Sequence, residues 1–186
     1  MSAEVATYRF SVEEFNKLGE VGIFDEDDRV ELLDGEIIVM SPIGTQRART
    51  VMRLNWVLQH RLGDRVLFDV QSPTVMDEFS ESLPDIMLLK PRADFYSSAH
   101  PRPDDILLLI EVSDTTLAYD RGRKLRKYAE SGLVEVWIVD VNGHTIEQFR
   151  SPTGSTYSSS TRFRREQKIT IAAFPEVEFA IEELIG

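Results

Sequence analysis

Residues 106–113 read ILLLIEVS, a run of five aliphatic residues followed by a glutamate, a valine and a polar serine. Successive side chains of a strand point to opposite faces, so a strand that is apolar at every position must be covered on both faces. The segment therefore predicts a central strand of a sheet with helices packed on each side. Glu111, near the end of this strand, is costly to desolvate, and the fold must give it a partner.

Turn and periodicity signals place the other elements around this strand. Asp34-Gly35 lies between two β-prone runs and predicts a hairpin over residues 29–40, and Asn142-Gly143 predicts another that leads into 144–150. Further strands are expected at 65–70, 73–77, 85–90 and 134–141, and helices at 11–18, 46–62, 118–132 and 179–185. The polar run SPTGSTYSSS after residue 150 predicts a turn region, followed by one or two edge strands.

This order predicts an α/β fold that forms one domain over residues 1–186. We expect a mixed central sheet flanked by helices, with extra antiparallel strands at the C-terminus. The helix between the strands 106–112 and 134–141 predicts a parallel crossover.

Composition limits the classes of protein. The chain of 186 residues has no cysteine, which excludes disulfides, zinc–thiolate sites and thiol nucleophiles. No apolar run approaches the ~20 residues of a membrane span and the start does not resemble a signal peptide, so we expect a cytoplasmic protein with no membrane partner. The net charge of −11 opposes non-specific binding to nucleic acid, although basic residues cluster at 47–53, 121–127 and 162–165. These clusters form either local basic surfaces or ordinary solvated faces.

Two acids at strand ends are candidates for a metal site. Asp85 follows Pro84 and begins one predicted strand, whereas Glu111 lies near the end of another. If these strands pair antiparallel, the two carboxylates converge, and a divalent cation would relieve their repulsion. Carboxylate oxygens suit Mg²⁺ or Mn²⁺, which can activate water and neutralise charge on a phosphate. Glu31, in the predicted hairpin, is a third candidate ligand.

Lys124 is a candidate catalytic cation. On a helical wheel it borders the apolar face that contains Tyr128, whereas Lys127 and the neighbouring arginines point away. A lysine at such a border can extend its stem over apolar surface and deliver its ammonium to the strand ends, where it would stabilise developing phosphate charge. Asp120 and Tyr128 share its stripe as supporting residues, although Tyr128 can equally be a core residue with a satisfied hydroxyl.

Four blocks in order, RVELLDGEI, LPDIMLL, LLIEVSDTT and AYDRGRKLRKYAESGLVEVWIVD, resemble the Uma-two family of predicted restriction endonucleases, within the PD-(D/E)XK nuclease superfamily. The resemblance covers about residues 8–185. It implies a restriction-endonuclease-like fold with an αβββαβ core, and metal-dependent hydrolysis of phosphodiester bonds in DNA. It places the two acids of the superfamily on Asp85 and Glu111, and the acid of the first block on Glu31.

Two positions depart from the family pattern. The superfamily has a lysine two residues after its second acid, where this chain has Ser113, and the resemblance implies that Lys124 replaces it. Relatives often have a histidine near the start of the long helix, where this chain has Arg47; arginine cannot act as a general base but can hold phosphate. Arg121 is a second phosphate-binding candidate, and Gln71 is a candidate support of the metal site.

Each candidate also has a structural interpretation. Glu111 can be satisfied by backbone N–H groups or by an ion pair with Lys124. Asp85 can cap a turn after proline, and Glu31 can belong to a cross-strand charge pair. Lys124 can pair with Asp120 along the helix.

Three functions are compatible with these residues. The first is a Mg²⁺-dependent endonuclease acting on DNA, which would form a homodimer if it cleaves with two-fold symmetry, with the β-rich C-terminal segment as a candidate interface. The second is a non-catalytic interaction module on the same fold, which Ser113, Arg47 and the acidic charge favour. The third is a metal-dependent hydrolase of a smaller nucleotide substrate, which an acidic surface would hinder less than a polymer.

Overall fold

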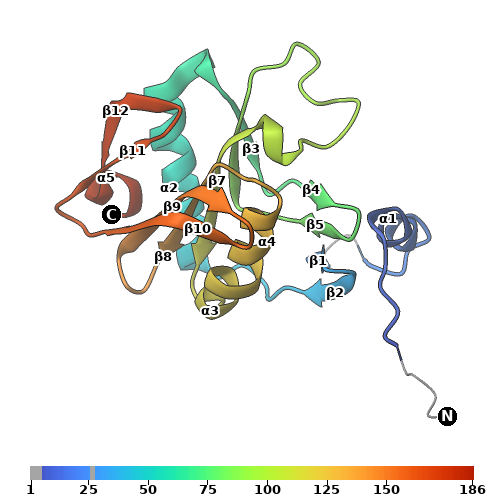
Figure 1. The fold of residues 1–186 in the computed structure, drawn as a ribbon. Coiled ribbons are helices and arrows are strands. Elements are labelled where there is room, and N and C mark those ends of the chain that lie inside the picture. Colours follow the sequence, from blue (N-terminus) through green and yellow to red (C-terminus); the bar gives the residue numbers. More distant parts are fainter. Residues whose placement is uncertain (1–5, 26–27) are drawn as a thin grey trace.

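The computed structural model describes residues 6–25 and 28–186, and a six-stranded mixed sheet lies at its centre (Figure 1). From one edge to the other, the strands are β10 (Thr156–Phe163), β9 (Thr145–Thr153), β8 (Glu135–Asp140), β7 (Ile106–Ser113), β6 (Ile86–Leu89) and β3 (Leu67–Val70). β7 and β8 run parallel, and the other neighbours are antiparallel. The mixed sheet and the central place of ILLLIEVS within it are confirmed.

Both faces of this sheet are covered, as the apolar character of β7 requires. On one face, α2 (Thr45–Leu62) packs Leu54 and Leu58 into a core that includes Ile110. On the other face, Tyr128 packs in a second core that includes Leu109. Alternate residues of one strand thus enter two separate cores, which fixes the register of β7 against its neighbours.

The connection from β7 to β8 is helical but not a regular α-helix. It consists of α3 (Leu117–Tyr119), a π-helical turn (Asp120–Lys124) and α4 (Leu125–Glu130). A π-turn adds a residue to the turn, so a wheel drawn at 3.6 residues per turn does not hold across it. The prediction that Lys127 points away was wrong: its side chain is buried, and its ammonium lies 2.5 Å from Asp34 and 3.0 Å from Asp77.

A second, four-stranded sheet carries the predicted hairpin. Its strands are, in order, β2 (Glu36–Val39), β1 (Val30–Leu33), β5 (Ser80–Ser82) and β4 (Thr74–Asp77). Asp34 and Gly35 have φ angles of 53° and 79°, the left-handed conformations that a tight hairpin turn requires. β5 was not predicted, because its three residues, SES, carry no hydrophobic pattern. The N-terminal α1 (Val12–Glu20) begins with a capping box formed by Ser11 and Glu14.

The C-terminal part is richer in strand than predicted. SPTGSTYSSS does not form a turn region: its ends belong to β9 and β10, and only the turn between them is irregular. The remaining elements are β11 (Lys168–Ile171), β12 (Phe174–Ala180) and α5 (Ile181–Ile185), which lies beside α2, together with short 3₁₀ turns at Gly63–Arg65 and Pro103–Asp105. Among the described residues, no helix combines the length and the apolarity that crossing a bilayer requires.

A buried carboxylate ties this C-terminal part to the central sheet. Glu135 in β8 is fully buried and accepts hydrogen bonds from the indole of Trp137 at 2.7 Å and the side-chain amide of Gln148 at 2.8 Å. These two groups donate to Oε1, and Arg150 lies 3.1 Å from the same oxygen as the counter-charge, whereas Oε2 accepts from the backbone amide of Ala172 at 2.6 Å. One side chain thus joins three segments that are distant in the sequence.

Replacing Glu135 with alanine is expected to lower the free energy of unfolding by about 3–5 kcal/mol, because the buried donors and Arg150 lose their acceptor. Urea unfolding followed by circular dichroism measures the change. The control is Glu178→Ala, which removes an exposed ion pair to Lys168 and should change stability by less than about 1 kcal/mol. Similar losses in the two variants would contradict this assignment.

Candidate active site

Asp85 and Glu111 occupy neighbouring register positions at one edge of the central sheet. β6 and β7 pair antiparallel with Ile86 opposite Ile110. Asp85 immediately precedes Ile86 and Glu111 immediately follows Ile110, so the two acids are next to each other in this register. Both are buried, with exposed fractions of 0% and 1%.

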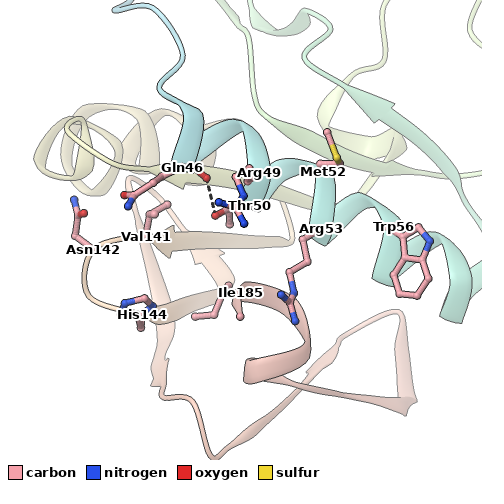
Figure 2. Close-up of a pocket in the computed structure, with 11 residues that line it drawn as sticks. Gln46, Arg49, Thr50, Met52, Arg53, Trp56, Val141, Asn142, His144 and Ile185 are labelled. Atoms are coloured by element: carbon pink, nitrogen blue, oxygen red, sulfur yellow. Dashed lines mark hydrogen bonds between the residues drawn. The ribbon is translucent and has the colours of Figure 1, made fainter.

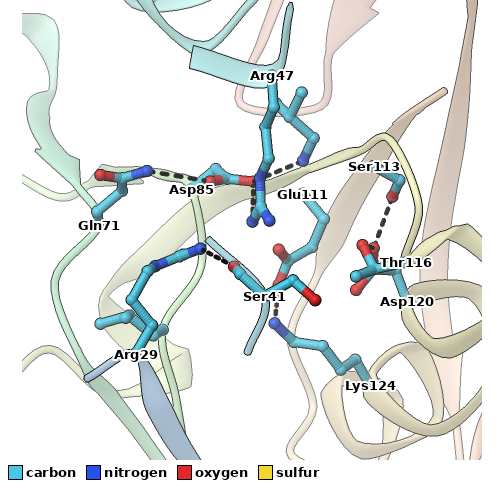
Figure 3. A network of polar contacts seen from close by, with 12 residues as sticks. Arg29, Ser41, Arg47, Gln71, Asp85, Glu111, Ser113, Thr116, Asp120 and Lys124 are labelled. Atoms are coloured by element: carbon cyan, nitrogen blue, oxygen red, sulfur yellow. Dashed lines mark hydrogen bonds and ion pairs between the residues drawn. The ribbon is translucent and has the colours of Figure 1, made fainter. Parts of the chain in front are cut away.

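Asp85 has one well-bonded oxygen and one weakly bonded oxygen (Figure 3). Its Oδ2 accepts from the backbone amide of Val112 at 2.8 Å and from the guanidinium of Arg47 at 2.9 and 3.2 Å. Among the described residues, its Oδ1 has only a long contact, 3.4 Å, from the side-chain amide of Gln71. Gln71 is held beside Asp85 because its backbone N–H donates to the Asp85 carbonyl at 3.1 Å.

In the part of the chain that the structure describes, the side chain of Glu111 is bonded through a single oxygen. Its Oε1 lies 2.7 Å from the ammonium of Lys124 and accepts from the hydroxyl of Tyr128 at 2.5 Å. Tyr128 is fully buried, as a core residue with a satisfied hydroxyl would be. The pKa of Glu111 is raised to about 7, mainly by burial. The ammonium of Lys124 lowers this pKa, and the negative charges of Asp120, Asp85 and Glu31 raise it.

Lys124 is fully buried between two carboxylates. Its Nζ lies 2.7 Å from Glu111 and 3.1 Å from Glu31. Burial lowers the pKa of Lys124, but the surrounding negative groups, Glu111 first, outweigh it and hold that pKa well above its usual range. The side chain is therefore an ammonium. Among the described residues, Glu111 and Glu31 are its charged partners, and burial keeps this ammonium out of water.

Glu31 holds Lys124 rather than joining the two other acids. Its Oε1 accepts from the hydroxyl of Tyr119 at 3.1 Å, and its Oε2 accepts from the amide of Leu83 at 3.3 Å and lies 3.1 Å from Lys124. No group of three or more Asp, Glu, His or Cys side chains in residues 6–25 and 28–186 could hold a metal ion. The role of Glu31 as a third metal ligand stays a prediction; in the structure both of its oxygens contact protein groups.

Asp120 fixes the π-helical turn that delivers Lys124. Its Oδ2 accepts from the hydroxyls of Ser113 at 2.7 Å and Thr116 at 2.6 Å. Ser113, two residues after Glu111, thus anchors the start of the helical connection that carries Lys124. In the described contacts Lys124 makes no ion pair with Asp120, so the predicted pairing along the helix is absent.

Replacing Asp120 with alanine is expected to lower kcat of a reaction catalysed at this site roughly tenfold with little change in KM, because Lys124 loses its fixed position. The unfolding free energy should fall by about 1–3 kcal/mol, since the buried hydroxyl of Ser113 and the part-buried hydroxyl of Thr116 lose their acceptor. Steady-state kinetics measure the first effect. Asp120→Asn retains an acceptor and should recover most of kcat; an unchanged kcat in the alanine variant would contradict a positioning role.

The two candidate phosphate-binding arginines have different surroundings. Arg47 is buried beside Asp85 in the candidate site. Burial lowers the pKa of Arg47, but the negative charge of Asp85 raises that pKa by more, so the guanidinium stays charged. Arg121 forms ion pairs with Glu147 at 2.5 Å and Asp140 at 3.7 Å. No contact joins Arg121 to Asp85 or Glu111 in the described residues, so the structure does not bring it into this site.

Two residues of the network were missed by the sequence reasoning. Arg29 lies beside it and donates to the carbonyl of Ser41 at 3.3 Å (Figure 3). Burial, and then Arg47, lower the pKa of Arg29. Its spacing of two residues from Glu31 would have placed both on one face of a strand. Tyr119 had no such signal, because its position depends on the helical connection.

The comparison with known proteins identifies the family. The Uma2 family model, described as "Putative restriction endonuclease", matches residues 12–182. The chain belongs to the Uma2 family. A solved Anabaena variabilis protein, described as "a putative nuclease belonging to DUF820", matches this Uma2 chain with a TM-score of 0.73 and 14% identity over 95% of this chain and 97% of the other. That likeness shows a shared fold, and no curated protein matches.

In this Uma2 protein, Asp85 and Glu111 offer a donor set that suits a hard divalent cation. Oδ1 of Asp85 has only its long contact with Gln71, and no hydrogen bond to Oε2 of Glu111 occurs in the described residues. Carboxylate oxygens are the ligands that Mg²⁺ and Mn²⁺ prefer. Mg²⁺ commonly binds one or two carboxylates and retains water or substrate oxygens in its other positions. Two carboxylates without a third therefore fit such an ion.

Proposed function

We propose that this Uma2 protein is an endonuclease that hydrolyses phosphodiester bonds in DNA, with Mg²⁺ or Mn²⁺ held by Asp85 and Glu111. The carrying observation is the register that sets these two acids side by side, with the Lys124 ammonium 2.7 Å from Glu111. When bound, the cation would neutralise charge on the scissile phosphate and lower the pKa of a water molecule. The site is of the PD-(D/E)XK type, with its lysine supplied by the helix after Ser113.

The surrounding residues hold the charges in place. The buried ammonium of Lys124 would stabilise negative charge that develops on the phosphate, and its effect is large because it lies out of water. Tyr128 and Glu31 orient Lys124 and Glu111. Arg47 fixes one oxygen of Asp85, and its planar guanidinium can donate to a phosphate oxygen at the same time.

The experiment is cleavage of supercoiled plasmid and of single-stranded DNA. Cleavage is expected with Mg²⁺ or Mn²⁺ and should be absent with chelator. Asp85→Asn should abolish it, whereas Asp64→Asn, an exposed acid outside the network, should leave it unchanged. Equal activity in wild type and Asp85→Asn would reject the proposal. Nucleotides in the same reactions test hydrolysis of a smaller substrate, and sedimentation tests for the dimer that symmetric cleavage needs.

A second candidate, a non-catalytic interaction module, has one observation in its favour. Arg47 and Lys124 pair with Asp85 and Glu111, so the negative charge of both acids is already compensated by protein groups. A metal ion would have to displace Arg47 or weaken these ion pairs in order to bind, and that cost would reduce metal affinity. Titration calorimetry with Mn²⁺ separates the two candidates: a dissociation constant in the millimolar range or weaker, together with no cleavage, would favour the module.

A further inference from the structure

A groove lies along the outward face of α2, away from the core. It has a volume of about 640 Å³ and is bounded by α2, the turn after β8 and the end of α5 (Figure 2). Gln46, Arg49, Arg53 and Trp56 recur at intervals of three or four residues and form one stripe that lines it. This stripe is distinct from the buried stripe of α2, which faces the sheet.

The groove adjoins the candidate active site. Asn142, in its wall, donates to the backbone carbonyl of Asp114 at 3.0 Å and to its carboxylate at 2.9 Å. Asp114 directly follows β7 and is three residues beyond Glu111. Three residues of extended chain span at most roughly 10 Å. A polymer at the carboxylates can therefore continue into the groove.

The groove is basic in a strongly acidic protein. Its described lining residues include two arginines, Arg49 and Arg53, and no acid, whereas the whole chain has 21 basic and 32 acidic residues. Within the described residues Arg49 makes no ion pair, and Arg53 is bonded only to the backbone carbonyls of Glu182 and Glu183. This local excess of arginine favours an anionic ligand such as a phosphate chain.

The groove also exposes apolar and aromatic surface. Trp56 is 65% exposed, and its indole stacks on His60 with an interplanar angle of 1°. Met52, one turn earlier, is 71% exposed. In a duplex the bases are stacked inside and the outer surface presents phosphates, whereas an unpaired strand also presents base faces to aromatic side chains. Arginines beside an exposed indole therefore fit a single strand better than a duplex.

We infer that this groove binds a single-stranded segment of nucleic acid, with phosphates on Arg49 and an unstacked base on Trp56. The choice of nucleic acid as the ligand rests on the proposed function. The groove would hold the strand that flanks the scissile phosphate, so the protein would prefer a substrate that is unpaired on that side.

Fluorescence anisotropy of the full chain with a labelled oligothymidylate, in chelator so that no cleavage occurs, tests this inference. Trp56→Ala should weaken binding roughly tenfold or more. Arg49→Gln should lower the affinity and reduce the slope of log affinity against log salt by about 0.7, the value for one phosphate contact on a single strand. The controls are Phe95→Ala and Arg126→Gln, which change exposed residues outside the groove and should bind as wild type does.

The outcomes separate this inference from the proposed function. If both groove variants bind as tightly as the wild type, or if the wild type does not bind, the inference that the groove binds a single strand is overturned. The nuclease proposal is then still tested separately by the cleavage assay with Asp85→Asn. The affinity for a duplex of equal length should not change in Trp56→Ala. Equal losses of affinity for the duplex and the single strand would overturn the assignment to a single strand. A chain that binds through the groove but cleaves nothing supports the groove alone. Circular dichroism verifies that these surface variants are folded.

Discussion

Replacing Glu111 with glutamine is expected to reduce the rate of DNA cleavage by roughly 10²–10³-fold or more, which is typical when one electrostatic interaction that stabilises the transition state is removed from a buried active site. Glutamine has nearly the same volume and can still accept the hydrogen bond from Tyr128. It carries no negative charge, so it cannot bind a divalent cation strongly and no longer pairs with Lys124. Initial rates on plasmid DNA at saturating Mg²⁺ measure the change.

The matched control for this variant is Glu81→Gln. Glu81 is also buried, with 6% exposed, but it lies in β5 and its only side-chain partner in the described residues is Asn16 at 3.5 Å. Burial raises its pKa, as it raises that of Glu111. The control should cleave at close to the wild-type rate. If both variants lost activity equally, the loss would reflect burial of an acid in general and not a role of Glu111 in the reaction.

Replacing Lys124 with methionine is expected to lower the unfolding free energy by about 3–5 kcal/mol and to reduce cleavage by roughly 10²-fold or more. Stability falls because Glu31 and Glu111 would be left buried with no cation between them. The phosphate would also lose the positive charge that stabilises its transition state. Chemical unfolding and cleavage rates are measured on the same preparation. Lys90→Met, at an exposed position, is the control and should change neither quantity substantially.

A second variant separates folding from chemistry at Lys124. Adding Glu31→Gln to Lys124→Met removes one of the two uncompensated carboxylates, so the double variant should recover much of the lost stability. Its cleavage should remain as low as that of the single variant, because the ammonium is still absent. Recovery of cleavage along with stability would show that Lys124 serves the fold only.

The elements that the sequence predicted well carry strong local signals. α2 has a long helical pattern that ends before Gly63, and the first hairpin has Asp34-Gly35 at its turn. Both signals act through a few neighbouring residues. The elements that were missed carry none: β5 is three polar residues, and the serine-rich β10 forms a strand because it pairs with β9 along almost its whole length. Such strands are stabilised by partners that the local sequence does not show.

The candidate site divides in the same way. Asp85 and Glu111 could be assigned to adjacent strand ends because unbroken apolar runs mark both strands and a buried strand has a well-specified register. The pairing of Glu111 with Lys124 was among the interpretations that the sequence allowed, whereas the partners from other elements could not be assigned. Arg47 reaches Asp85 from the start of α2, and Glu31 reaches Lys124 from a different sheet.

The sequence by itself determined which acids stand at the ends of the central strands, since an unbroken apolar run marks each strand and the acid adjoins that run. It also predicted that Lys124 reaches these strand ends. Only the tertiary structure decided that Lys124 lies between Glu111 and Glu31, and that Lys127 turns to another cluster of acids. The additional acids belong to the second sheet, and helical periodicity contains no information about how that sheet packs on the helix or about the π-helical turn that Asp120 holds.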